Sequence, residues 1–165
     1  MAGGDKIDIF PGEHWYGASR CDPRVVDLYS RHYSSIRSNK NKGDWLRSGI
    51  TAPGEQIVLL SSDSRALFVW LKQKYSADDQ AGVNCAVFRN EGPFLSSMLI
   101  EEAEGIAWAR WPGERLYTYV DPGEIKSKNP GCCFKKCGWK TVKVNGETYR
   151  SQRGLIVLEK MTFDT

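Results

Sequence analysis

The sequence predicts an α+β fold, because short runs of β-forming residues alternate with segments of helical periodicity. Two β-rich runs, 56–62 and 66–73, are separated by a short polar turn, which is typical of a β-hairpin. The stretch 94–111 has the amphipathic spacing of one long helix. The chain has 165 residues, close to the usual size of one domain, so we expect a single domain over residues 1–165.

Composition excludes a membrane-spanning protein. Apolar residues make up 41% of the chain and charged residues 26%, as in globular domains. No apolar run approaches the ~18 residues that cross a bilayer. The first ten residues lack the cationic start and long apolar stretch of a secretory signal. We therefore expect a cytoplasmic protein with no membrane partner, in which a reducing environment keeps the five cysteines as thiols.

The N-terminal third predicts one helix and one loop. Asp22 is a suitable N-cap, and Pro23 suits the first helical position, so we expect a helix over about 22–36. The region that follows, about 37–55, is rich in turn residues and has little periodicity. It is longer than most connections in a compact domain, which predicts a mobile or functional loop.

The rest of the chain predicts alternating strands and helices. After the hairpin we expect, in order, a strand over 84–90, the long helix, a strand over 115–120, a short helix after Pro130, and closing strands over 141–144 and 154–161.

This order of elements resembles that of the GNAT acyltransferases over most of residues 55–160. The resemblance implies a three-layer fold with a central mixed, mostly antiparallel sheet flanked by helices. It also implies acetyl-coenzyme A or another acyl-coenzyme A as the acyl donor. In that family the loop from a strand into the next helix holds the coenzyme diphosphate, and "RNEGPF" (89–94) matches its motif in part. Arg89 and Gly92 fit, whereas Phe94 replaces a small residue and Pro93 lacks an N–H group.

Four short segments resemble a narrower group within the GNAT-like proteins. "FRNEGPFLSSMLI", "RLYTYVDP", "NPGCCFKKCGW" and "RHYSS" are similar to segments of phage-encoded GNAT-like proteins of the Mom type. Those proteins modify nucleobases in phage DNA and so protect it from host restriction. The resemblance implies a base, or an already modified base, in DNA as acyl acceptor, and the cytoplasm of a phage-infected cell as location.

The donor site that the resemblance implies lies where the strand over 84–90 meets the long helix. The free N–H groups and the positive dipole end of that helix suit a phosphate. An ordinary turn capped by Ser96 is the alternative. The expected donor-binding residues are Val87, Phe88, Arg89, Asn90, Gly92, Ser96, Ser97 and Asn129.

The candidate catalytic residues are Tyr117, Tyr119, Asp121 and His32. In the GNAT fold the strands over 84–90 and 115–120 splay apart around the thioester, and the two tyrosines share one face of the second strand. Buried structural tyrosines are the alternative, and Asp121 before a proline is equally suited to capping a turn. The histidine has an ordinary pKa near ~6.5, which suits proton transfer, although a lone histidine is more often structural.

One departure from the family concerns the acid that protonates the leaving thiolate. Many GNAT enzymes use a tyrosine on the short helix, and the corresponding residue here is Phe134. Tyr117, Tyr119, Ser127 or solvent is expected to take that role, and the alternative is that the enzyme does not use simple acyl-coenzyme A chemistry.

Basic residues gather in two stretches, 31–47 and 126–143. Basic side chains neutralise phosphates and an aromatic ring can stack on an extruded base. The candidate nucleic-acid contacts are Arg31, Tyr33, Arg37, Lys40, Lys42, Trp45 and Arg47. A solvated surface is the alternative for either stretch.

The cysteine-rich segment 129–139 does not have the spacing of a metal site. In a helix after Pro130, Cys133 and Cys137 share one apolar face, and Gly138 ends the helix. We expect no metal. Beside the DNA-modifying acyltransferase, two functions stay open: an N-acetyltransferase of a small amine or protein, and a non-catalytic DNA-binding or interaction module.

Overall fold

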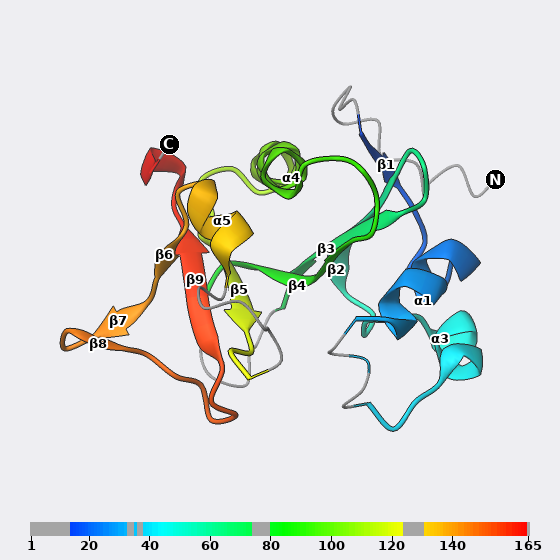
Figure 1. The fold of residues 1–165 in the computed structure, drawn as a ribbon, viewed down its shortest axis with the longest axis horizontal. Helices are drawn as coiled ribbons and strands as arrows, with labels where there is room; N and C mark the ends of the chain where they lie inside the picture. The colour runs from blue at the N-terminus through cyan, green and yellow to red at the C-terminus, as the bar shows by residue number, and fades with distance from the viewer. Residues whose placement is uncertain (1–13, 33–34, 36–37, 74–79, 124–130, 165) are drawn as a thin grey trace.

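The computed structural model describes residues 14–32, 35, 38–73, 80–123 and 131–164 (Figure 1). The elements, in chain order, are β1 (Trp15–Gly17), α1 (Pro23–Ser30), α3 (Lys42–Ser48), β2 (Glu55–Ser61), β3 (Ala66–Lys72), β4 (Val83–Asn90), α4 (Ser96–Arg110), β5 (Leu116–Val120), α5 (Cys132–Lys136), β6 (Lys140–Thr141), β7 (Lys143–Val144), β8 (Glu147–Thr148), β9 (Ile156–Lys160) and a final 3₁₀ turn (Thr162–Asp164).

Seven strands form one sheet in the order β1-β2-β3-β4-β5-β9-β6, and β7 and β8 form a separate hairpin. The β4–β5 pair is parallel, whereas the other pairs of the large sheet are antiparallel. A parallel neighbour requires a crossover connection, and α4 provides it. The predicted fold class, a mixed and mostly antiparallel sheet flanked by helices, is confirmed.

The sheet separates two hydrophobic clusters. Strand residues alternate between faces, so that Ile57 and Leu59 join one cluster while Val58 and Leu60 join the other. The first cluster includes residues of α4 and α5, and the second includes residues of α1 and α3. This explains the continuous apolar runs 57–60 in β2 and 66–71 in β3: both faces of these runs are covered.

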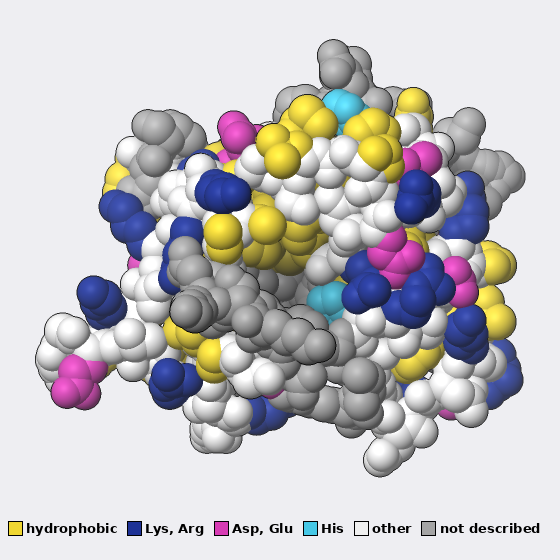
Figure 2. All heavy atoms as spheres, in the orientation of Figure 1, with side chains coloured by type: hydrophobic (Ala, Val, Ile, Leu, Met, Phe, Trp, Pro, Cys, Tyr) yellow, Lys and Arg dark blue, Asp and Glu magenta, His cyan; other side chains and the backbone are white. Residues whose placement is uncertain are grey.

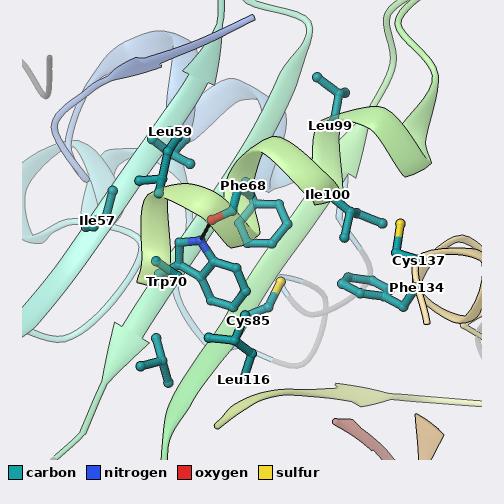
Figure 3. Close-up of a cluster of buried hydrophobic side chains, with 14 of the residues drawn as sticks. Ile57, Leu59, Phe68, Trp70, Cys85, Leu99, Ile100, Leu116, Phe134 and Cys137 are labelled. Atoms are coloured by element: carbon teal, nitrogen blue, oxygen red, sulfur yellow. Dashed lines mark hydrogen bonds between the residues drawn. The ribbon is translucent and has the colours of Figure 1, made fainter. Parts of the chain in front are cut away.

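Aromatic side chains dominate the cluster beneath α4 (Figure 3). Trp70 is fully buried, and its indole N–H donates to the carbonyl of Ala103 on α4 at 2.8 Å. Phe68 packs against the same ring, with centroids 4.6 Å apart. A buried indole normally needs a hydrogen-bond partner, and this one fixes α4 against β3.

A buried ion pair joins α4, the end of α5 and β9. The Lys160 ammonium donates to a Glu104 carboxylate oxygen at 2.8 Å and to the Cys137 carbonyl at 2.6 Å. The second carboxylate oxygen accepts from the Trp139 indole at 2.7 Å. Lys160 and Glu104 are only 5% and 4% exposed, so these hydrogen bonds compensate for the loss of water.

The first helix is shorter than the predicted range of 22–36. Asp22 caps it as expected, accepting from the Arg24 N–H at 2.8 Å. The helix ends at Ser30, however, because the Ser35 hydroxyl donates to the carbonyls of Ser30 and His32 at 3.0 and 2.8 Å. A hydroxyl that binds these carbonyls competes with continuation of the helix.

The expectation of a loop without regular structure over 37–55 is wrong at its centre, where α3 spans Lys42–Ser48. A capping box starts this helix: the Asn41 side chain accepts from the Asp44 N–H, and the Asp44 carboxylate accepts from the Asn41 N–H. Such a box satisfies two N–H groups of the first turn and stabilises a helix too short to show periodicity.

The predicted strand over 141–144 is also corrected. It is divided into β6, which pairs with β9, and β7, which pairs with β8 around a tight turn at Asn145 and Gly146. Both turn residues have positive φ, 54° and 81°, as a two-residue hairpin turn requires.

The cysteine segment forms the predicted short helix, α5, followed by Gly138 at φ 92°. Cys137 is buried, and Cys133 packs against the same hydrophobic cluster. The Cys137 thiol donates to the carbonyl of Ser97 at 3.2 Å, and burial raises its pKa to about 12. In the described part of the chain, no helix is both long and apolar enough to cross a membrane.

Candidate active site

The parallel strands β4 and β5 separate halfway along β4. Their pairing runs from Val83 opposite Leu116 to Cys85 opposite Thr118 and then stops, while β4 continues to Asn90. The register of β4 with β3 shifts at the same level, between Val69 and Trp70. A bulge of this kind bends a strand and redirects its end. The last part of β4 therefore pairs with β3 on one side and is not paired with β5 on the other.

The separation opens on a hollowed face of the molecule (Figure 2). Hydrophobic side chains lie above the hollow, and a group of basic and acidic side chains lies to its right. In the same view α4 lies above this region, α5 to its upper left and α1 to its right (Figure 1).

Asn90 shapes the turn from β4 into α4. Its amide nitrogen donates to the Phe94 carbonyl at 2.7 Å and to the Ser96 hydroxyl at 2.9 Å, and its amide oxygen accepts from the Gly92 N–H at 3.0 Å. The side chain thus uses its hydrogen bonds within the turn. These hydrogen bonds fix the conformation of the turn from β4 into α4.

The first turn of α4 has no side-chain cap. Leu95 occupies the N-cap position and makes no capping hydrogen bond, and Ser96 does not cap the helix. The first N–H groups of a helix have no partner within the helix. The N-terminus of α4 therefore presents N–H groups and a positive dipole end at the mouth of the β4–β5 separation.

Two arginines share one carboxylate beside this helix end. Arg31 donates to both oxygens of Glu91 at 2.7 and 2.8 Å, and Arg89 donates to one of them at 2.6 Å. The Arg31 guanidinium, followed by that of Arg89, holds the pKa of Glu91 at about 2. Glu91 therefore stays ionised at neutral pH and binds both arginines.

The ion pairs continue from α1 to α3. Arg31 also donates to Asp27 at 2.9 Å, and the other oxygen of that carboxylate accepts from Lys42 at 3.0 Å. All three side chains are more than two-fifths exposed, so these contacts position the side chains more than they stabilise the fold.

His32 lies against the unpaired part of β4. It is 7% exposed, and burial followed by the charge of Arg89 lowers its pKa to about 4, while a hydrogen bond to the Phe88 backbone opposes that shift. The imidazole is therefore neutral at pH 7. His32 follows the end of α1, and its hydrogen bond to the Phe88 backbone links this segment to β4, the strand that borders the opening.

The low pKa of His32 predicts a pH-dependent stability. Between pH 6.5 and about 4 the unfolded state binds a proton on this histidine that the native state does not, so stability rises with pH across that window. The difference should be on the order of 3 kcal/mol between the ends of the window. Urea unfolding of the protein and of a His32→Gln variant measures it; equal pH profiles for the two proteins would contradict the assignment.

The two tyrosines of β5 share one face, as predicted. Their rings meet edge to face with centroids 5.8 Å apart. Tyr117 lies within the paired part of β5, is 2% exposed, and has the Arg115 guanidinium over its ring. Tyr119 lies one residue beyond the last β4–β5 pair and is half-buried. Tyr119 is thus the better placed of the two to meet a ligand in the opening.

Asp121 caps a turn. Its carboxylate accepts from the Gly123 N–H at 2.9 Å, which is the alternative that the following proline indicates. Phe134 is buried between Phe88 of β4 and Trp139, with ring centroids 5.9 and 4.9 Å apart. The helix α5 thus presents an apolar ring where the resembling family has a hydroxyl.

The remaining donor-site residues take different positions. Val87 is buried in the cluster beneath α1 and α3, whereas Phe88 packs against the opposite cluster. Gly92 lies against the β2–β3 turn, where an added Cβ would come within 3.1 Å of Asp63 and Arg65. The Ser97 carbonyl accepts from Cys137. Asn129 lies outside the described residues.

The residues proposed to contact nucleic acid are not all available for it. Trp45 is 5% exposed and packs edge to face on Tyr29 with ring centroids 4.9 Å apart, so it would have to leave the core to stack on an extruded base. Arg47 is exposed and pairs with Asp44, and Lys40 is exposed. Tyr33 and Arg37 lie outside the described residues.

Sequence reasoning missed the role of Glu91 and the structural use of Asn90. An acidic residue is unexpected in a loop that should bind phosphate, and this could have indicated that Glu91 pairs with nearby basic side chains. Within the described residues no group of three or more histidine, cysteine or acidic side chains could hold a metal ion.

Comparison with known proteins supports the fold. No family model matches the sequence, and no curated protein is significantly similar to it. Among solved structures, the chain is similar to a Bordetella pertussis protein assigned to the GnaT acetyltransferase family, with a TM-score of 0.53 and 10% sequence identity. The match covers 92% of this chain and 98% of the other. The chain therefore has a GNAT-like fold.

Proposed function

We propose that this protein is an acyltransferase that transfers an acyl group from acetyl-coenzyme A, or another acyl-coenzyme A, to a nucleobase or an already modified base in DNA. The observation that supports this most is the separation of β4 and β5 beside the uncapped N-terminus of α4. A GNAT-like fold that keeps this opening has the arrangement needed to hold a long, phosphate-bearing thioester.

The residues at the opening fit such a donor. The N–H groups of the first turn of α4 would bind the diphosphate, with Arg89 adding positive charge. The unpaired edge of β4 offers backbone groups to the amides of the donor's extended arm. Within the paired part of β4, the Asn84 side-chain oxygen is buried and has no hydrogen-bond partner among the described residues.

When bound, the acyl-coenzyme A supplies an activated acyl group as a thioester. His32 would accept a proton and Tyr119 would donate one at the opening. An amine becomes strongly acidic as it bonds to the acyl carbon, so a neutral imidazole of low pKa suffices to accept its proton. The Tyr119 hydroxyl would protonate the departing sulfur, because Phe134 offers none. Burial of His32 and partial burial of Tyr119 limit competing reactions with water.

We propose DNA as the acceptor on the basis of the resemblance of short segments to Mom-type proteins and of the charge distribution. The same resemblance would imply the cytoplasm of a phage-infected cell as the location. Most of the exposed basic residues near α1 and α3, however, are in ion pairs with acidic neighbours. A nucleic-acid contact at this end would therefore exchange one ion pair for another.

Two measurements test the function. Acetyl-coenzyme A should raise the melting temperature of the purified protein, because a ligand that binds only the native state stabilises it. Mass spectrometry of nucleosides from DNA of cells expressing the protein should show an added acyl group, which a Tyr119→Phe variant should reduce. Unmodified DNA despite tight acetyl-coenzyme A binding would favour an N-acetyltransferase of a small amine or protein.

The non-catalytic alternative has specific observations in its favour. Pro93 removes an N–H group from the loop, Glu91 places a negative charge in it, and Phe134 replaces a hydroxyl. No stabilisation by acetyl-coenzyme A at millimolar concentration would favour a DNA-binding or interaction module of this fold.

The charge of Glu91 yields a prediction for donor affinity. A Glu91→Gln variant should bind acetyl-coenzyme A about fivefold more tightly at low salt, because a nearby surface charge contributes on the order of 1 kcal/mol. In this variant the guanidiniums of Arg31 and Arg89 are released from a competing carboxylate. Isothermal titration calorimetry measures the change.

Asp27→Asn is the matched control. It removes the same charge and also a partner of Arg31, but on the side away from the loop. The affinity of this variant for acetyl-coenzyme A should stay within about twofold of that of the parent protein. Weaker binding by Glu91→Gln than by the parent would mean that the carboxylate is needed to hold the arginines in place.

A further inference from the structure

A short hairpin projects from the sheet away from the rest of the molecule (Figure 1). We call residues 142–150 the β7–β8 arm. All four residues of β7 and β8 are exposed, and so are Asn145 and Gly146 at the turn. A two-stranded ribbon without a hydrophobic face contributes little to stability. The arm therefore has no evident role in forming the core.

Backbone hydrogen bonds anchor the base of the arm to β9. The Val142 N–H donates to the Val157 carbonyl at 2.8 Å, and the Tyr149 N–H donates to the Val142 carbonyl at 2.9 Å. Val157 lies directly opposite Tyr119 in the β5–β9 pair. The arm is thus connected to the candidate catalytic strand through adjacent strands of one sheet.

Charge is concentrated on the arm and its flanks. The segment 135–153 contains six basic residues and one acidic residue, Glu147, for a net charge of +5. Since the whole chain has a net charge of +3, the other 146 residues together carry −2. The exposed basic residues of this segment are Lys136, Lys140, Lys143, Arg150 and Arg153. Figure 2 shows basic side chains spread over this side of the hollowed face.

These features favour duplex DNA over other polyanions. A two-stranded ribbon fits the major groove of a duplex, and basic residues at its base can reach the phosphates on either side. A membrane surface would require an apolar face on the arm. Val144 is the one large hydrophobic residue of segment 135–153 that is strongly exposed, and it is isolated.

We propose that the β7–β8 arm and its basic flanks bind duplex DNA and hold it against the hollowed face that contains the β4–β5 opening. The inference names the part of the protein that positions the acceptor, and in that respect it rests on the proposed function. The DNA contact itself does not depend on acyl transfer. It also moves the main DNA-binding surface away from α1 and α3, whose basic residues are paired with acids.

The test is a salt titration of duplex binding. A labelled DNA duplex is titrated with the parent protein and with a triple variant, Lys143→Gln, Arg150→Gln and Arg153→Gln. The log–log salt slope of the binding constant should fall by about 3, since each lost phosphate contact removes roughly one unit. The matched control carries Arg24→Gln, Lys72→Gln and Arg110→Gln, which change the net charge equally on other surfaces. Its slope should stay that of the parent.

Three results would overturn the proposal: an unchanged slope in the arm variant, equal losses in both triple variants, or tighter binding of the parent protein to phosphatidylserine vesicles than to the duplex at equal salt. Acetyl-coenzyme A should stabilise the arm variant and the parent equally. If it stabilises neither, the acyltransferase proposal fails, and the duplex titration still decides whether the arm binds DNA.

Discussion

Replacing Lys160 by methionine should lower the free energy of unfolding by about 3 to 5 kcal/mol. The substitution leaves the Glu104 carboxylate buried with the Trp139 indole as its described partner, and it also removes the donor to the Cys137 carbonyl. An unpaired buried charge is among the most costly defects in a protein interior. Urea denaturation at pH 7 measures the loss.

A double variant separates the charge from the packing. Lys160→Met combined with Glu104→Gln removes both charges, while the glutamine oxygen can still accept from Trp139. This protein should recover at least about half of the lost stability, because no buried charge remains unpaired. Arg110→Met serves as the surface control, since its pair with Glu55 is exposed and should contribute less than about 1 kcal/mol. A single-variant loss no larger than that of the surface control would show that water reaches the pair.

Replacing His32 by glutamine should reduce the turnover number of the proposed transferase by about 10² to 10⁴, the usual contribution of a general base. Glutamine can still donate a hydrogen bond to the Phe88 backbone, so the fold around β4 should persist. Stabilisation by acetyl-coenzyme A should therefore be unchanged. Because the pKa of His32 is about 4, activity above pH 5 should not depend on its titration.

His14→Gln is the control for this experiment. The other histidine of the chain contacts Glu102 on α4 at 2.5 Å rather than β4, so its loss should change turnover less than about twofold. Full activity in His32→Gln would assign His32 a structural role and leave Tyr119 and solvent as the proton carriers.

The sequence predicted those helices and strands that have a long apolar pattern or have glycine and proline at their ends. The β2–β3 hairpin, the strand–helix–strand unit from β4 to β5, and α5 ending at Gly138 all appear as expected. The strands β2 and β3 contain continuous apolar runs, buried residues alternate along β4, and glycine and proline bound α5 in the sequence. The divergence of β4 and β5 came from the resemblance and is now seen in the register.

The errors arose where local pattern was too short to interpret. With seven residues, α3 has fewer than two full turns, so its sequence does not show that Trp45 faces the core. Its Asn41–Asp44 capping box was the one readable signal. The contact of Arg31 with Glu91 joins residues 60 positions apart, and no local rule predicts such a pair.

The separation of β4 and β5 means that the proposed acyl-coenzyme A donor would also have a structural role. Three residue pairs join β4 to β5, and beyond them the sheet has a backbone edge inside the molecule rather than at its border. A donor lying along that edge would act as an inserted strand and complete the sheet from within. Binding of the donor would then make the sheet more rigid, because the donor itself would supply hydrogen bonds between the two halves of the sheet, which β4 and β5 do not make beyond their three pairs.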